Sequence, residues 1–114
     1  MNECLFCRII SGEIQGNVVY QDQQLTAFRD INPQAPTHLL IVPNEHLTST
    51  NEMSEQHIPL MGRIVHVAAE LARQEGLGAG GYRLVVNTGP DAGQSVGHFH
   101  LHLLGGRRLG WPPG

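Results

Sequence analysis

Three histidines that alternate with large apolar residues form the segment of this chain best suited to chemistry. In a β-strand, successive side chains point to opposite faces, so the three imidazoles would share one face and the apolar side chains the other. A helix would distribute the same residues around its axis and give the alternation no purpose. We therefore predict a half-buried strand over residues 97–104. Its histidines are His98, His100 and His102, and the alternating apolar residues are Phe99, Leu101 and Leu103.

The spacing of these histidines favours a catalytic imidazole over a shared metal ion. Residues i and i+2 of a strand lie about 6.6 Å apart, and residues i and i+4 about 13 Å apart. Zinc–nitrogen bonds of about 2.0–2.1 Å therefore allow at most two of the three to bind one ion. A neutral imidazole is a good nucleophile toward phosphorus when an acceptor holds the proton on its other nitrogen. His38 opens another β-prone run and could add a fourth imidazole beside this strand.

A turn-rich segment just before the histidines could hold a phosphate without a metal ion. Gly93 lets backbone N–H groups approach an anion closely, and the Gln94 amide and Ser95 hydroxyl add donors. Charge grows on the non-bridging oxygens during phosphoryl transfer, and fixed donors with a nearby imidazolium can stabilise it. On this hypothesis catalysis requires no cofactor.

The remaining segments predict the elements that must position these side chains. Apolar residues at helical spacing predict a short helical segment over residues 6–14 and one long helix within residues 54–75. Further β-prone runs predict strands at residues 17–20, 25–29, 38–42 and 82–87. This order favours an α+β fold, with an antiparallel sheet and helices on one face. His57 and His66 fall on or near the long helix, where we expect a solvated face.

Composition excludes several classes of protein. The chain has 114 residues, 40% of them hydrophobic, and a formal net charge of −3, which suits a single domain over residues 1–114. No run of basic residues could follow a nucleic-acid backbone, and no apolar stretch is long enough to span a membrane. Because no basic leader precedes an apolar segment, we expect a cytoplasmic protein without nucleic-acid or membrane partners.

The chain resembles the histidine triad (HIT) family. The hallmark of that family, three histidines alternating with apolar residues, matches residues 98–104 throughout, and residues 30–38, 93–96 and 111–114 resemble its nucleotide-binding branch. The resemblance covers nearly the whole chain. It implies a HIT-like fold with a five-stranded antiparallel sheet, a short N-terminal helix and one long helix. It also implies a homodimer with a continuous sheet, in which Trp111 near the C-terminus would influence the partner's substrate choice.

The resemblance implies a hydrolase that cleaves the phosphorus–nitrogen bond of purine nucleoside 5'-phosphoramidates. His100 would attack the α-phosphorus and form a nucleotidyl-histidine, which water then cleaves. His102 and His38 would hold the phosphate and relay protons, and His98 would support them. The implied nucleotide-binding residues are Asp30 for the ribose hydroxyls, Phe28 and Ile31 for the purine, and Asn87, Gln94 and Ser95 with His100 and His102 for the phosphate.

The two cysteines leave two alternatives open. Cys4 and Cys7 have the spacing of half a zinc site, which needs two further ligands. Some histidine triad proteins bind a structural zinc, and that resemblance implies His46 and His98 as the other two ligands here. Other members lack the metal, and a pair of reduced, buried thiols is the alternative.

Other interpretations also remain at this stage. Within the same superfamily, the chain could hydrolyse dinucleoside polyphosphates or transfer a nucleotide to another phosphate. It could instead be a nucleotide-binding regulatory module with incidental hydrolysis, or a metal-dependent β-barrel enzyme that uses two of the histidines. Asp30 could simply make an Asx turn before Asn32 and Pro33.

Overall fold

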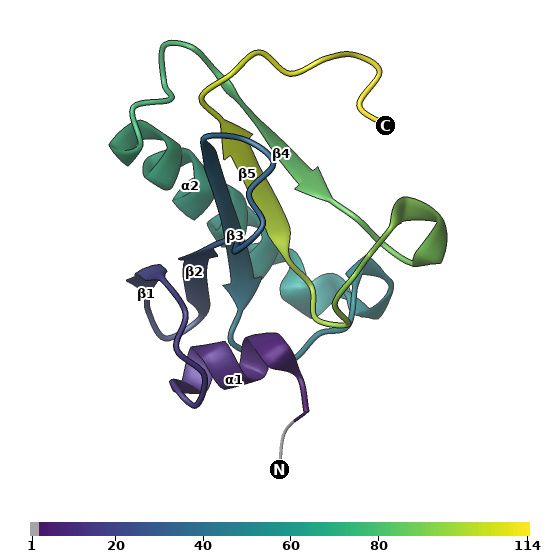
Figure 1. The fold of residues 1–114 in the computed structure, drawn as a ribbon. Coiled ribbons are helices and arrows are strands. Elements are labelled where there is room, and N and C mark those ends of the chain that lie inside the picture. The colour runs from purple at the N-terminus through teal and green to yellow at the C-terminus, as the bar shows by residue number, and fades with distance from the viewer. Residues whose placement is uncertain (1–2) are drawn as a thin grey trace.

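A five-stranded antiparallel sheet carries most of the candidate site residues. The computed structural model describes residues 3–114. The strands are β1 (Val18–Gln21), β2 (Leu25–Arg29), β3 (Thr37–Pro43), β4 (Tyr82–Val86) and β5 (Leu101–Gly105). They follow the spatial order β1-β2-β3-β5-β4 (Figure 1). β5 therefore lies between β3 and the edge strand β4, and its His102 pairs with Leu40 of β3.

The long helix α2 (Ile58–Gln74) covers one face of the sheet. Pro59 lies in its first turn, where the missing backbone N–H costs little, and Gly76 follows its end with a φ of 78° that favours glycine. Its apolar stripe, including Ile64, Val67 and Leu71, packs on side chains that β3 and β5 direct to this face. No helix within residues 3–114 has the length and apolar character needed to cross a membrane.

The short helix α1 (Leu5–Ser11) lies on the other face (Figure 1). Alternation along β3 sends Leu39 to the α2 side, whereas Leu40 joins a separate apolar cluster with Phe6 of α1 and Phe28 of β2. The expectation that both helices share one face is therefore wrong. A strand such as β3, which is buried along its whole length, needs a cover on each side.

The histidine segment is a strand over only part of its predicted length. β5 begins at Leu101, so His98 lies in a bend before it and His100 in irregular backbone. The ladder with β3 ends at the pair Ile41–Leu101, and the Phe99 N–H donates instead to the carbonyl of Leu47 at 2.6 Å. The alternation nevertheless survives, because Phe99 and Leu101 both lie in the α2-side core.

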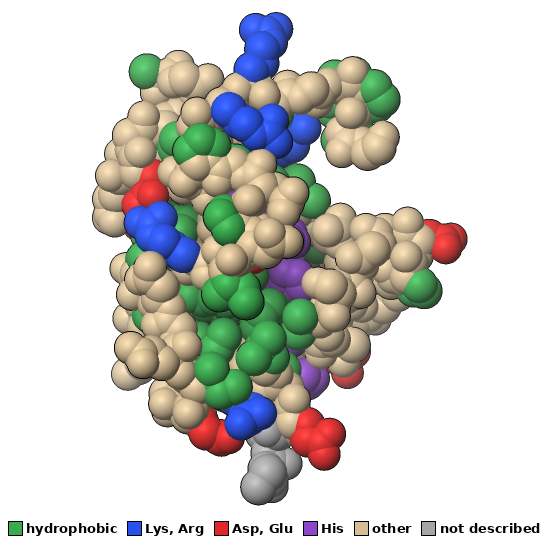
Figure 2. Space-filling model, in the orientation of Figure 1, with side chains coloured by type: hydrophobic (Ala, Val, Ile, Leu, Met, Phe, Trp, Pro, Cys, Tyr) green, Lys and Arg blue, Asp and Glu red, His purple; other side chains and the backbone are tan. Residues whose placement is uncertain are grey.

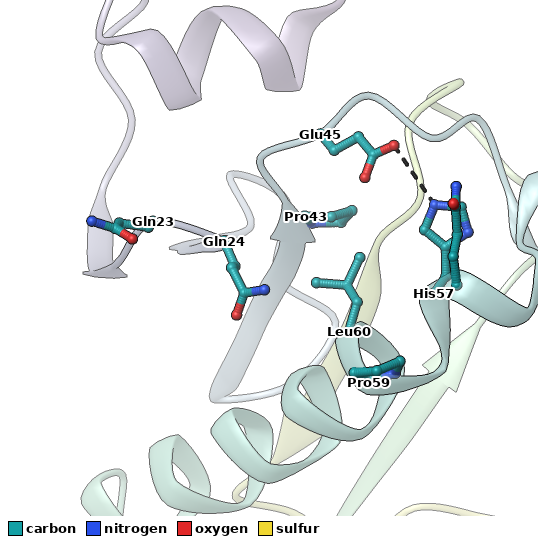
Figure 3. Close-up of a pocket in the computed structure, with 8 residues that line it drawn as sticks. Gln23, Gln24, Pro43, Glu45, His57, Pro59 and Leu60 are labelled. Carbon is teal, nitrogen blue, oxygen red and sulfur yellow. Dashed lines mark ion pairs between the residues drawn. The ribbon is translucent and has the colours of Figure 1, made fainter.

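His57 is buried, and the expectation of a solvated position for it is wrong. It is 6% exposed, and its Nδ1 accepts a hydrogen bond from the Ser54 N–H at 3.0 Å, which completes a capping box. Its Nε2 faces the Glu45 carboxylate at 3.6 Å, beside a surface hollow of about 400 Å³ at the start of α2 (Figure 3). His66, by contrast, is exposed as expected.

Candidate active site and metal cluster

Two of the histidines, His100 and His102, line a hollow of about 330 Å³ between α1 and the sheet. In Figure 2 the histidines lie in a groove next to apolar side chains. Phe6, Phe28 and Leu40, all at most 5% exposed, contribute to its apolar wall. His100 and His102 form its polar side. An apolar wall beside two imidazoles suits a ligand that has both an apolar ring and a polar or charged group.

The backbone fixes the proton of His100 on the nitrogen that faces away from the hollow. His100 Nδ1–H donates to the carbonyl oxygen of His98 at 2.8 Å, so in the neutral ring Nε2 carries the free lone pair. Phe6 packs edge-on against the His100 ring, with centroids 5.1 Å apart and planes at 87°. The residue is 5% exposed. The ring is thus held in place with a nucleophilic nitrogen available.

His38 and His102 form a directed hydrogen-bonded pair. The Gln34 N–H donates to His38 Nδ1 at 3.0 Å, so the proton of neutral His38 lies on Nε2. That nitrogen is 2.9 Å from His102 Nδ1, which must then accept, and His102 keeps its own proton on Nε2. The pair therefore presents a donor to the hollow, beside the lone pair of His100. Gln34 acts through its backbone N–H, a group that every residue except proline carries, so its side-chain type could not have indicated this role.

Burial keeps both members of this pair neutral at pH 7. It lowers the pKa of His38, an effect that Asp30 partly opposes. It also lowers the pKa of His102 to about 4, with smaller contributions from His100 and His38. An anion bound beside such a pair would favour its protonated form.

Asp30 lies at the edge of this pair and also makes the Asx turn. Its Oδ1 accepts from the Asn32 N–H at 2.8 Å, and its Oδ2 lies 3.5 Å from His38 Nε2. Asp30, His38 and His102 together could in principle hold a metal ion. The hydrogen bond from the Gln34 N–H argues against it, because it leaves the proton of His38 on the nitrogen that would have to bind the ion.

The structure brings some of the predicted nucleotide-binding residues to the hollow and leaves others away from it. Phe28, Asp30, Ile31 and Ser95 line it, with Ile31 99% exposed at its rim. Gln94 is engaged elsewhere, since its amide donates to the carbonyls of Thr48 and Val96 and accepts from the Gly89 N–H. Asn87 follows β4 directly, just beyond the last pair Val86–Leu101, and is not among the residues that line the hollow.

Cys4, Cys7, His46 and His98 form a second cluster with zinc-like geometry. Their ligand atoms all lie within 4.8 Å of one another. His98 Nδ1 lies 3.3 Å from Cys4 Sγ and 3.5 Å from Cys7 Sγ, and His46 Nδ1 lies 3.4 Å from Cys7 Sγ. A tetrahedral zinc places sulfur and nitrogen ligands about 3.5 Å apart. The four residues thus fit such an ion.

The protonation of His98 also suits a metal ligand. Its Nε2–H donates to the Pro43 carbonyl at 2.8 Å, so in the neutral ring Nδ1 offers its lone pair to the cluster. Burial lowers the pKa of His98, which keeps the ring neutral. The Cys7 N–H donates to Cys4 Sγ at 3.4 Å.

Known proteins resemble this chain over nearly its full length. A protein-family model described as "Scavenger mRNA decapping enzyme C-term binding" matches residues 3–108. The purine nucleoside phosphoramidase of Escherichia coli (strain K12) is 53% identical over 108 residues, which are 95% of this chain and 91% of that protein. The 14 kDa zinc-binding protein of Zea mays is 53% identical over 112 residues, 96% of this chain and 87% of that protein.

A solved structure agrees with these matches. The HIT family hydrolase from Legionella pneumophila Philadelphia 1 superposes with a TM-score of 0.97 at 52% sequence identity, and the match covers 98% of this chain and 100% of that one. Fold and sequence thus point to the same group of proteins.

Proposed function

The chain belongs to the histidine triad family, and we propose that it hydrolyses the phosphorus–nitrogen bond of purine nucleoside 5'-phosphoramidates. One observation carries this proposal. The hydrogen bond from His100 Nδ1–H to the His98 carbonyl leaves a nucleophilic Nε2 in a hollow of about 330 Å³, beside a donor on His102. A relative that is 53% identical is named a purine nucleoside phosphoramidase.

In the first step His100 replaces the amine on phosphorus. The phosphate of the bound substrate is negative and lies beside His102, so the His38–His102 pair takes up a proton on binding. His100 Nε2 forms a bond to the α-phosphorus as the phosphorus–nitrogen bond breaks, and the departing nitrogen takes a proton from His102 Nε2. The products of this step are the free amine and a nucleotidyl-histidine.

In the second step water releases the nucleotide. His102 Nε2, which has just lost its proton, accepts a proton from water as the water oxygen bonds to phosphorus and the bond to His100 breaks. The products are a nucleoside 5'-monophosphate and regenerated His100. The buried apolar wall beside the imidazoles would limit the access of bulk water to the reacting atoms.

The remaining residues of the hollow would bind the nucleotide. Phe28 and the exposed Ile31 would enclose the purine, and Asp30 would accept hydrogen bonds from the ribose hydroxyls at Oδ2 once the Asx turn has occupied Oδ1. The Ser95 hydroxyl would reach the phosphate. For Asn87, which follows the last β4–β5 pair Val86–Leu101, we propose a phosphate contact. For Gln94, we propose a supporting role in the loop before Ser95.

The second cluster would hold a structural zinc ion through Cys4, Cys7, His46 and His98. Four protein ligands leave no open coordination position, so the ion would take no part in the reaction. It would instead hold α1 against His98, which lies two residues before the nucleophile. Thiolate ligands persist in a reducing compartment, which supports a cytoplasmic location.

A homodimer would form along the edge strand β4. Its outer edge pairs with no other described strand, and Tyr82 and Val86 are each 38% exposed there. Pairing with the same strand of a second copy would satisfy that edge and join the two sheets.

The nucleotidyl-histidine provides the decisive test. We expect brief incubation with adenosine 5'-phosphoramidate, followed by a quench without acid, to yield a covalent adenylyl adduct on His100 in intact and peptide mass spectra. The His100→Ala variant should form no adduct, and His66→Ala, which changes an exposed histidine, should behave as wild type. Folded wild-type protein that neither labels nor releases amine would contradict the proposal. Faster turnover of a diadenosine polyphosphate would favour the alternative hydrolase.

A further inference from the structure

The loop between β2 and β3 supplies the hydrogen bond that sets the direction of the histidine pair. Its Gln34 N–H donates to His38 Nδ1 at 3.0 Å. The Asx turn at Asp30 and a hydrogen bond from Gln34 Nε2 to the Asn32 carbonyl at 3.0 Å hold the loop internally. The Asp30 N–H ties it to β3 through the His38 carbonyl at 3.0 Å. None of these hydrogen bonds reaches the residues after β5.

Arg107 makes that connection. Its Nε and Nη2 both donate to the Gln34 carbonyl oxygen, at 3.2 and 3.0 Å. The turn after β5 brings the side chain there. Gly106 has a φ of 94°, and a Cβ on it would lie 2.8 Å from Pro36 Cβ, so only glycine allows this close approach. The start of β3 and the end of β5 pair at this end of the sheet (Figure 1).

We propose that Arg107 is a positioning residue for catalysis, which holds Gln34 so that its N–H fixes the tautomer of His38. The Gln34 carbonyl accepts from Arg107, and the Gln34 N–H donates to His38. The inference rests on the proposed function, because it concerns the histidines that would protonate the leaving amine.

Loss of this hydrogen bond would reverse the polarity of the site. Without the Gln34 N–H, neutral His38 can move its proton to Nδ1 and turn a bare Nε2 toward His102. His38 Nε2 and His102 Nδ1, which lie 2.9 Å apart, can then form a hydrogen bond only if the proton of His102 lies on Nδ1. In the resting site His102 would then present a lone pair to the hollow, in place of the N–H that faces the substrate phosphate in the wild type.

Histidine tautomers can be measured directly by long-range ¹H–¹⁵N spectra of protein labelled at histidine nitrogens. We expect His38 and His102 of the wild type to be protonated at Nε2 only. In Arg107→Gln both should become mixtures of tautomers. Arg108→Gln is the matched control, because that neighbouring side chain is exposed and makes no hydrogen bond within the described residues, and its spectra should match the wild type.

Kinetics give the second measurement. We expect kcat for adenosine 5'-phosphoramidate to fall about tenfold in Arg107→Gln, with KM changed less than about threefold. Arg107→Lys, which retains one donor, should recover part of kcat. Single tautomers in Arg107→Gln, or an equal loss in Arg108→Gln, would overturn the inference. The spectra decide it even if the wild type hydrolyses no phosphoramidate, which is the failure of the proposed function itself.

Discussion

Removal of one thiolate from the four-residue cluster tests whether it binds zinc or contains only reduced thiols. Cys7 is the informative position, since its Sγ lies within 3.5 Å of a ring nitrogen of both His46 and His98. Zinc that binds only the folded chain raises the free energy of unfolding by about 4 kcal/mol when its free concentration is a thousandfold above the dissociation constant. Helix α1 has seven residues and is too short to persist undocked.

We therefore expect Cys7→Ser to lower the free energy of unfolding by about 3 kcal/mol, which corresponds to a fall in Tm of about 12 °C. Circular dichroism would follow unfolding in denaturant, with and without a chelator, and native mass spectrometry would count zinc per chain. His66→Asn is the control, because this exposed histidine lies outside the cluster. If the wild type holds no zinc and Cys7→Ser costs less than about 1 kcal/mol, the reduced-thiol alternative is correct.

Two further predictions concern stability and assembly. Because the pKa of His102 is about 4 in the folded chain and about 6.5 in the unfolded chain, the unfolded chain binds a proton first as the pH falls. Stability should therefore be full above pH ~6.5 and fall by about 3 kcal/mol toward pH ~4. In urea titrations His102→Asn should flatten this decline, and an unchanged decline would contradict the assignment. Val86→Lys should shift the proposed dimer to monomers in light scattering without changing the circular dichroism, and an unchanged mass would argue against pairing through β4.

Patterns that depend on periodicity predicted the fold well. The apolar stripe of residues 54–75 predicted α2, and the alternation after His98 predicted which residues face the core. The start of β5 was misplaced because alternation reports which face a side chain takes and not whether its backbone has a partner. Here the Phe99 N–H bonds to Leu47, and His98 uses its ring to reach the Pro43 carbonyl.

Positions that depend on a specific contact were harder to predict. His57 was expected on a solvated helix face, yet it caps the turn that begins at Ser54. The spacing from Ser54 to His57 is that of a capping box. The residue three positions after the cap is usually Glu or Gln, however, so a histidine there was a weak signal. The phosphate contact expected of Gln94 stays a prediction, and its side-chain amide donates to the carbonyls of Thr48 and Val96.

Backbone groups, which no sequence pattern displays, decide the chemistry of the four imidazoles. The Pro43 carbonyl fixes the proton of His98, the His98 carbonyl fixes that of His100, and the Gln34 N–H fixes that of His38. His98 belongs to both centres, since its ring lies in the cysteine cluster and its carbonyl orients the nucleophile. A disturbance of the cluster that moves the backbone at His98 should therefore weaken the hydrogen bond at His100 Nδ1, although no ligand of the cluster contacts phosphorus. Stability and turnover should accordingly decline together in Cys7→Ser, whereas Arg107→Gln should lower turnover alone.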